Sequence, residues 1–104
     1  PFPGKRQPDY ALRVKGDSMI GAGIEDGDIV YMRHAPWADY NGQIVAALID
    51  DQENGTLKRI RWSSKSPKIQ LIPENPDYDV IEVMPNEVTI CGVYMGHFKP
   101  ERGV

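Results

Sequence analysis

The chain alternates short apolar, β-branched runs with turns rich in Gly, Pro, Asn and Asp. Within several runs, apolar and polar side chains alternate with the period of two that is typical of half-buried strands. Seven such runs predict seven strands, at residues 10–15, 29–33, 43–49, 56–62, 68–72, 80–84 and 88–95.

The run at residues 43–49 differs from the others because its side chains are apolar on both faces. A strand buried on both faces belongs in the middle of a sheet. The polar segment 50–55 then predicts a hairpin turn that pairs 43–49 with 56–62 in antiparallel fashion. Together the runs predict a mainly β fold, a single-domain folded antiparallel sheet or barrel-like domain with at most one short helix after Ser18.

With 104 residues, the chain has room for one domain. Residues 1–9 hold three prolines, a glycine and three charged residues, a composition typical of a linker or tail. We therefore place the domain at residues 10–104. A chain that begins at Pro1 rather than Met is expected to be a fragment or a processed product.

Charge and cysteine content exclude several classes of function. Twelve Lys and Arg face fifteen Asp and Glu, so the chain lacks the positive field that binding to a phosphate backbone requires. Its longest apolar run is far shorter than the roughly twenty residues of a membrane-spanning helix. The single cysteine, Cys91, cannot form an internal disulfide, which favours the cytoplasm, and we expect it to be a small buried hydrophobe.

The segment Gly16-Asp17-Ser18-Met19 places a serine between a predicted strand and a glycine-rich turn. Ser18 could cap a short helix, or it could present its hydroxyl to a substrate. Taken alone, these four residues favour the cap.

Lys58 changes that balance. The period of two in residues 56–62 puts Lys58 on the same face as Ile60 and Trp62. An ammonium among apolar side chains must reach solvent, find a carboxylate, or lose its proton because desolvation lowers its pKa. A neutral lysine amine can act as the base that activates a serine hydroxyl, so Lys58 is a candidate partner for Ser18.

Five segments carry a resemblance to a known family. They are 16–19 (Gly-Asp-Ser-Met), 24–28 (Ile-Glu-Asp-Gly-Asp), 41–45 (Asn-Gly-Gln-Ile-Val), 56–59 (Thr-Leu-Lys-Arg) and 71–75 (Leu-Ile-Pro-Glu-Asn). In this order and approximate spacing, they resemble the C-terminal protease domain of the LexA-like family over about residues 10–98. That family comprises LexA, phage repressors of the lambda type and the UmuD proteins, which cut themselves through a serine-lysine dyad.

The resemblance implies a site and a function. Ser18 would be the nucleophile, Lys58 the general base, and the backbone amides of Asp17 and Ser18 the oxyanion hole, with no cofactor. The chain would be the autoproteolysis and dimerisation domain of a LexA-like or prophage transcriptional repressor. It would form a homodimer through the last strand, along the apolar side chains of Val88, Ile90, Val93, Tyr94 and Met95. It would respond to a RecA filament as co-protease, and reach DNA only through a missing N-terminal domain.

The family cuts an Ala-Gly or Cys-Gly bond upstream of the serine. No such pair lies between Pro1 and Ser18, whereas Ala22-Gly23 follows the serine inside the turn. We therefore expect the chain to be a cleavage product or a truncated form.

Three other functions fit parts of the pattern: a UmuD-like subunit of a translesion polymerase, a repressor dimerisation module that does not cut, and a signal peptidase. The signal peptidase lacks support because no membrane anchor is evident. A calcium site at Asp17, Glu25, Asp26 and Asp28 lacks the spacing of an EF-hand loop, so turn chemistry explains these carboxylates better. His34, His97 and Cys91 are too scattered in sequence to predict a zinc site.

Overall fold

The computed structural model describes residues 6–50 and 55–101, and within them the backbone forms a seven-stranded antiparallel sheet. The strands are β1 (Tyr10–Arg13), β2 (Ile29–Arg33), β3 (Ile44–Ile49), β4 (Thr56–Ser63), β5 (Ser66–Ile72), β6 (Ile81–Val83) and β7 (Val88–Phe98). Their order across the sheet is β1-β2-β7-β3-β4-β5-β6. The predicted mainly β, folded antiparallel sheet is confirmed.

Helical structure is limited, in the described residues, to two short 3-10 turns, η1 (Ile20–Ala22) and η2 (Pro85–Glu87). The sequence predicts at most one helix, after Ser18, so η2 is a correction. Pro85 begins η2 with a favourable φ, and the Glu87 side chain accepts a hydrogen bond from the Met84 amide at 2.7 Å. No helix among the described residues is long and apolar enough to cross a membrane.

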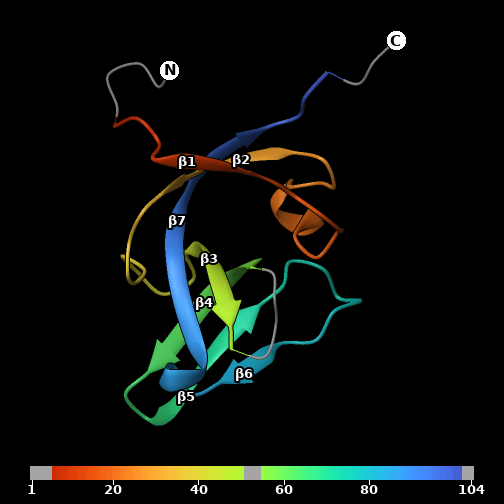
Figure 1. Cartoon of the computed structure of the whole chain (residues 1–104). Coiled ribbons are helices and arrows are strands. Elements are labelled where there is room, and N and C mark those ends of the chain that lie inside the picture. Colours follow the sequence, from red (N-terminus) through yellow and green to blue (C-terminus); the bar gives the residue numbers. More distant parts are fainter. Residues whose placement is uncertain (1–5, 51–54, 102–104) are drawn as a thin grey trace.

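β7 is the longest strand, and it joins the β1–β2 pair to the four strands β3 to β6 (Figure 1). Its first half pairs with β3 and its second half with β2, and the register shifts once along each pairing. β7 lies between β2 and β3 in the strand order, but among the described residues each half of it pairs with one strand only. Dimerisation through the last strand therefore stays a prediction. Ile90 and Val93, expected at that interface, are buried in the core.

β3 and β4 form the predicted antiparallel hairpin, with Val45 opposite Lys58. Part of the predicted turn, residues 51–54, lies outside the described residues. β3 is buried on both faces except at Leu48, as its apolar pattern predicts. Its alternate side chains enter two separate cores, with Ile44 and Ala46 in one and Val45 and Ala47 in the other.

The core that contains Ile44 and Ala46 also holds Met19, which is 2% exposed. Met19 follows Ser18 directly, so its burial holds the serine segment against β2, β3 and β4. Burying a methionine side chain contributes about 1.5–3 kcal/mol. The sheet thus supplies the fixed surface on which the residues around Ser18 are placed.

Candidate active site

The serine turn, residues 16–23, leaves β1 and returns toward β2. Gly16 adopts a φ of 86°, a conformation that favours glycine, and its amide donates a hydrogen bond to Asp26 Oδ1 at 2.8 Å. The N-cap of η1 is Met19, and no side chain caps this turn. The interpretation of Ser18 as a helix cap is therefore wrong.

Ser18 and Lys58, which are forty residues apart in sequence, meet in the structure. Lys58 Nζ lies 3.0 Å from Ser18 Oγ. The same nitrogen donates to Thr56 Oγ1 at 2.6 Å and to the Leu57 carbonyl at 3.1 Å. Thr56 was missed as a site residue, although its position two residues before Lys58 puts both side chains on one face of the strand.

The surroundings of Lys58 favour its neutral form more than water does. The residue is 5% exposed, and its described partners are hydroxyl and carbonyl oxygens rather than carboxylates. Burial lowers the pKa of Lys58 below its usual value. A neutral amine has two N–H donors, which Thr56 and the Leu57 carbonyl can accept, and one lone pair that is then left for the Ser18 hydroxyl proton.

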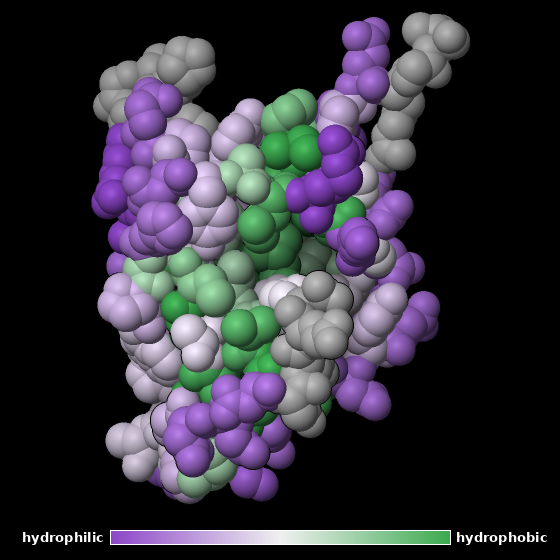
Figure 2. All heavy atoms as spheres, in the orientation of Figure 1, coloured by the Kyte–Doolittle hydropathy of each residue, from purple (hydrophilic) through white to green (hydrophobic). Residues whose placement is uncertain are grey.

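A cleft of about 570 Å³ opens beside Ser18. Its walls come from β1, the serine turn, β3, the start of β4 and one residue of β7. In the space-filling view, apolar side chains form a band down the middle of the face shown, with polar side chains on both sides (Figure 2). Apolar lining residues include Leu12, Val14 and Leu57, so the cleft suits an extended segment with small or apolar side chains.

Cys91 also lines this cleft and is exposed. The expectation that it is buried is wrong. Along β7, the period of two sends Ile90 into the core and turns Cys91 to the opposite face.

One end of the serine turn is held by the connection between β5 and β6. The Glu74 amide donates to the Ser18 carbonyl at 2.8 Å, and the Glu74 carbonyl accepts from the Gly21 amide at 2.7 Å. Asn75 Nδ2 donates to the Asp17 carbonyl at 2.9 Å, and the Tyr78 hydroxyl donates to the Asp17 carboxylate. Residues 71–75 carry one of the family motifs, but nothing in the sequence predicts these contacts.

This docking also explains a glycine. A Cβ on Gly21 would lie 2.7 Å from the Glu74 carbonyl oxygen, closer than real side chains allow. Any larger residue at position 21 would push the connection away from the serine turn.

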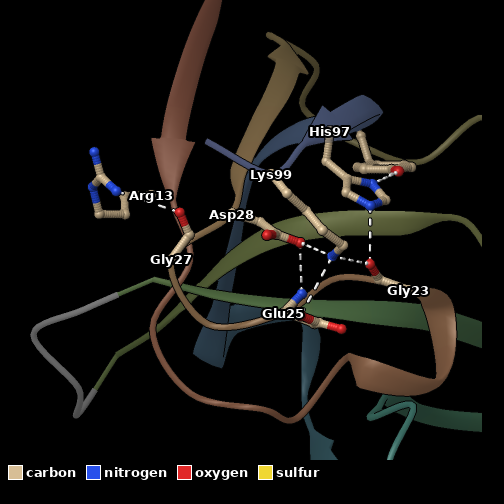
Figure 3. Close-up of polar contacts among 8 residues, drawn as sticks. Arg13, Gly23, Glu25, Gly27, Asp28, His97 and Lys99 are labelled. Atoms are coloured by element: carbon tan, nitrogen blue, oxygen red, sulfur yellow. Dashed lines mark hydrogen bonds and ion pairs between the residues drawn. The ribbon is translucent and has the colours of Figure 1, made fainter. Parts of the chain in front are cut away.

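The other end of the serine turn is held by the last residues of β7 and Lys99 (Figure 3). Lys99 Nζ donates to Asp28 Oδ2 at 2.8 Å and to the Gly23 carbonyl at 3.1 Å. His97 Nε2 donates to the same carbonyl at 3.0 Å, and its Nδ1 is within hydrogen-bond distance of the Tyr94 hydroxyl. The end of β7 therefore fixes the point where the serine turn rejoins β2.

Asp28 and Lys99 shift each other's pKa. Burial raises the pKa of Asp28, but the Glu25 amide and the Lys99 ammonium outweigh it, so the pKa of the carboxyl falls below its usual value. The hydrogen bond to Asp28 raises the pKa of Lys99 above its usual value. Asp28 is fully buried, and its Oδ1 has no hydrogen-bond partner among the described residues.

The four acidic residues considered for calcium each contact another group of the protein. Asp17 accepts from Tyr78, Asp26 from the Gly16 amide, and Glu25 and Asp28 both lie within ion-pair distance of Lys99. The residues considered for zinc also have separate contacts: the His34 ring lies tilted against the ring of Tyr10, whereas His97 contacts the serine turn. In residues 6–50 and 55–101, no three His, Cys, Asp or Glu side chains form a group that could hold a metal ion.

Comparison with known proteins adds a family to this geometry. Residues 2–95 match the family model described as Peptidase S24-like. The chain is 45% identical over 96 residues to the LexA repressor of Stenotrophomonas maltophilia, which covers 91% of this chain and 43% of that protein. It is 49% identical over 91 residues to the LexA repressor of Delftia acidovorans, a match that covers 86% of this chain and 38% of that protein. The chain thus spans less than half the length of either relative.

Proposed function

This chain belongs to the Peptidase S24-like family, and on that premise we propose that it is the autoproteolysis and dimerisation domain of a LexA-like transcriptional repressor. Ser18 is the nucleophile, and Lys58 is its general base. The observation that carries the proposal is the 3.0 Å separation of Ser18 Oγ and Lys58 Nζ, at a lysine that is buried with neutral partners.

The proposed reaction begins when Ser18 Oγ attacks the carbonyl carbon of the scissile peptide bond and its proton passes to Lys58 Nζ. The backbone amides of Asp17 and Ser18 form the oxyanion hole and donate hydrogen bonds to the oxygen that becomes negative. The C–N bond breaks as the Lys58 ammonium returns the proton to the departing amine. A water molecule, deprotonated in turn by Lys58, then hydrolyses the acyl ester and regenerates Ser18.

The remaining parts of the proposal concern the whole protein. The bond that is cut lies upstream of the domain, in a segment that can enter the apolar cleft beside Ser18. Residues 1–9 belong to a linker or tail, and the domain proper occupies residues 10–104. An N-terminal domain binds DNA, a RecA filament promotes cutting as co-protease, and the protein works in the cytoplasm.

We assign the homodimer surface to the outer half of β7, which pairs with β2 on one side and with no described strand on the other. Phe98 is 44% exposed there and stacks on Tyr31 with ring centroids 5.6 Å apart. Phe98→Asp should weaken the dimer without opening the core, whereas a charge at buried Ile90 or Val93 would unfold the domain. Sedimentation that shows an unchanged dimer for Phe98→Asp would reject this surface.

Self-cleavage of the protein with its natural upstream sequence tests the dyad. Ser18→Ala and Lys58→Ala should each abolish cutting while leaving the melting temperature close to that of the wild type, because the two residues act as one unit. A wild-type protein that is folded but never cuts would favour the non-cleaving dimerisation module. Cutting at the wild-type rate in either variant would reject the dyad. A UmuD-like role has no specific observation in its favour.

A further inference from the structure

The peptide unit between Asp17 and Ser18 is held in one orientation from outside the cleft. The Asp17 carbonyl accepts a 2.9 Å hydrogen bond from Asn75 Nδ2, in addition to a longer one, 3.3 Å, from the Ile20 amide within the turn. Asn75 comes from the β5–β6 connection, which does not contribute to the described lining of the cleft.

Asn75 is built into the fold as a fixed donor. It is 7% exposed, and its Oδ1 accepts a hydrogen bond from the Asp77 amide at 2.9 Å. That second bond determines which end of the side-chain amide faces Asp17, because the oxygen is already used by Asp77. Asn75 therefore presents an N–H group, and not an oxygen, to the Asp17 carbonyl.

In a planar trans peptide, the carbonyl of one residue and the N–H of the next point in opposite directions. Fixing the Asp17 carbonyl toward Asn75 thus fixes the Ser18 N–H away from Asn75. Among the described residues, the Ser18 N–H has no hydrogen-bond acceptor. It is an oriented and unused donor on the residue that carries the nucleophile.

We infer that Asn75 is a positioning residue for self-cleavage, which sets the oxyanion hole by holding the Asp17–Ser18 peptide unit so that the Ser18 N–H faces the reacting carbonyl. The inference rests on the proposed function. It adds a role for a residue that touches neither the substrate nor Lys58. Asn75 acts on the stabilisation of the negative oxygen, so its loss lowers the rate without changing the protonation of the base.

The test is the pH dependence of self-cleavage, from about pH 6 to about pH 11, in the protein with its natural upstream sequence. Asn75→Ala should lower the rate on the high-pH plateau by about tenfold to a hundredfold and leave the midpoint of the profile where the wild type has it. Asn75→Asp keeps the acceptor for the Asp77 amide and loses the donor, so its plateau should fall by a similar factor. This near-isosteric variant carries the test if Asn75→Ala does not fold.

Gln43 provides a matched control because it is also a buried side-chain amide, 7% exposed, and it binds Asp39 rather than the serine turn. Gln43→Ala and Gln43→Glu should cut within about threefold of the wild type. An equal loss in the Gln43 variants would mean that lower stability explains the effect, and it would overturn the inference.

Two further results would also overturn it. One is a folded Asn75 variant whose rate on the plateau equals that of the wild type. The other is an Asn75 variant with an unchanged plateau and a shifted midpoint, which would mean that Asn75 acts on the pKa of Lys58. In both cases the wild type still cuts and the proposed function stands. A wild type that does not cut would instead reject the proposed function.

Discussion

Two lysines flank the serine turn, and their surroundings have opposite effects on their protonation. Lys58 is buried, is surrounded by hydroxyl and carbonyl oxygens, and has a lowered pKa. Lys99 contacts the carboxylates of Asp28 and Glu25, and its pKa is raised. Burial favours the neutral form of Lys58, whereas the hydrogen bond to a carboxylate favours the charged form of Lys99.

The roles that we propose for the two lysines match these surroundings. A base for Ser18 must lose and regain a proton, which a nearby carboxylate would hinder by stabilising the ammonium. A residue that ties the end of β7 to Gly23 and Asp28 works best if its charge persists. The fold therefore keeps carboxylates next to Lys99, and the contacts of Lys58 in the described residues are neutral.

The largest expected effect comes from making the same substitution at both sites. Lys58→Arg should lower self-cleavage by at least about a thousandfold, because a guanidinium cannot give up its proton near neutral pH. Lys99→Arg keeps the cation beside Asp28 and should cut within about tenfold of the wild type. Cleavage on gels measures both, and comparable losses in the two variants would contradict the division of roles.

A second variant gives Lys58 the kind of partner that Lys99 has. Thr56→Asp would place a carboxylate beside Nζ, where the Thr56 hydroxyl now lies at 2.6 Å. The resulting attraction should move the midpoint of the pH–rate profile upward by about one to three pH units. Thr56→Val removes the oxygen without adding charge and is the control. A midpoint that moves as far in Thr56→Val as in Thr56→Asp would show that charge is not the cause.

Removing the cation at the other site should affect stability more than catalysis. Lys99→Met leaves the buried Asp28 carboxylate without its ammonium partner, so we expect the melting temperature near neutral pH to fall by several degrees. The measurement is the thermal unfolding midpoint of variant and wild type as a function of pH. Equal midpoints near neutral pH would mean that the ion pair does not stabilise the fold.

The pH window of this effect follows from the two shifts. Asp28 has a lowered pKa in the folded state, so its contribution is present above the unfolded value of about 3.9 and is lost as the pH falls through the folded pKa. Lys99 has a raised pKa, so its contribution is present below about 10.4 and is lost as the pH rises through the folded pKa. The gap between wild type and Lys99→Met should therefore be widest between these limits and narrow outside them.

The smallest effect is expected from Trp62→Ala. The sequence places Trp62 on the face of Lys58, but in the structure its ring packs edge-on against Trp37 at a centroid distance of 5.3 Å. Removing it should admit water and raise the midpoint of the pH–rate profile by less than about half a pH unit. A larger upward shift of the midpoint would show that Trp62, rather than the contacts around Ser18 and Thr56, excludes water from the Lys58 amine.

Local pattern predicted much of the fold. The strand at β3 followed from its apolar faces, and its hairpin with β4 followed from the polar turn between them. The central place of β7 did not follow, because its pairing with β2 spans most of the chain and no local signal marks such a contact. The exposure of Cys91 was missed for the same reason, since which face of β7 meets the core depends on that pairing.

The site residues also fall into those that the sequence predicts and those that it does not. Ser18 and Lys58 were identified as candidates from a strand break, a face and a family resemblance, and the structure brings them together. Thr56, Asn75 and Lys99 were not identified, because each acts through a contact with the backbone or with another candidate. A buried asparagine in a Pro-rich connection has the same sequence signature as an ordinary turn residue.

The most direct test of the central claim is to titrate the lysine side chains of the folded protein by NMR, using amino groups labelled at Cε and Nζ. Lys58→Arg and Lys99→Arg assign the two signals. We expect Lys58 to titrate below the ordinary lysine value of 10.5 and Lys99 above it, in the same sample. A Lys58 signal that titrates at or above the ordinary value would contradict the claim that the fold prepares this lysine as the base for Ser18.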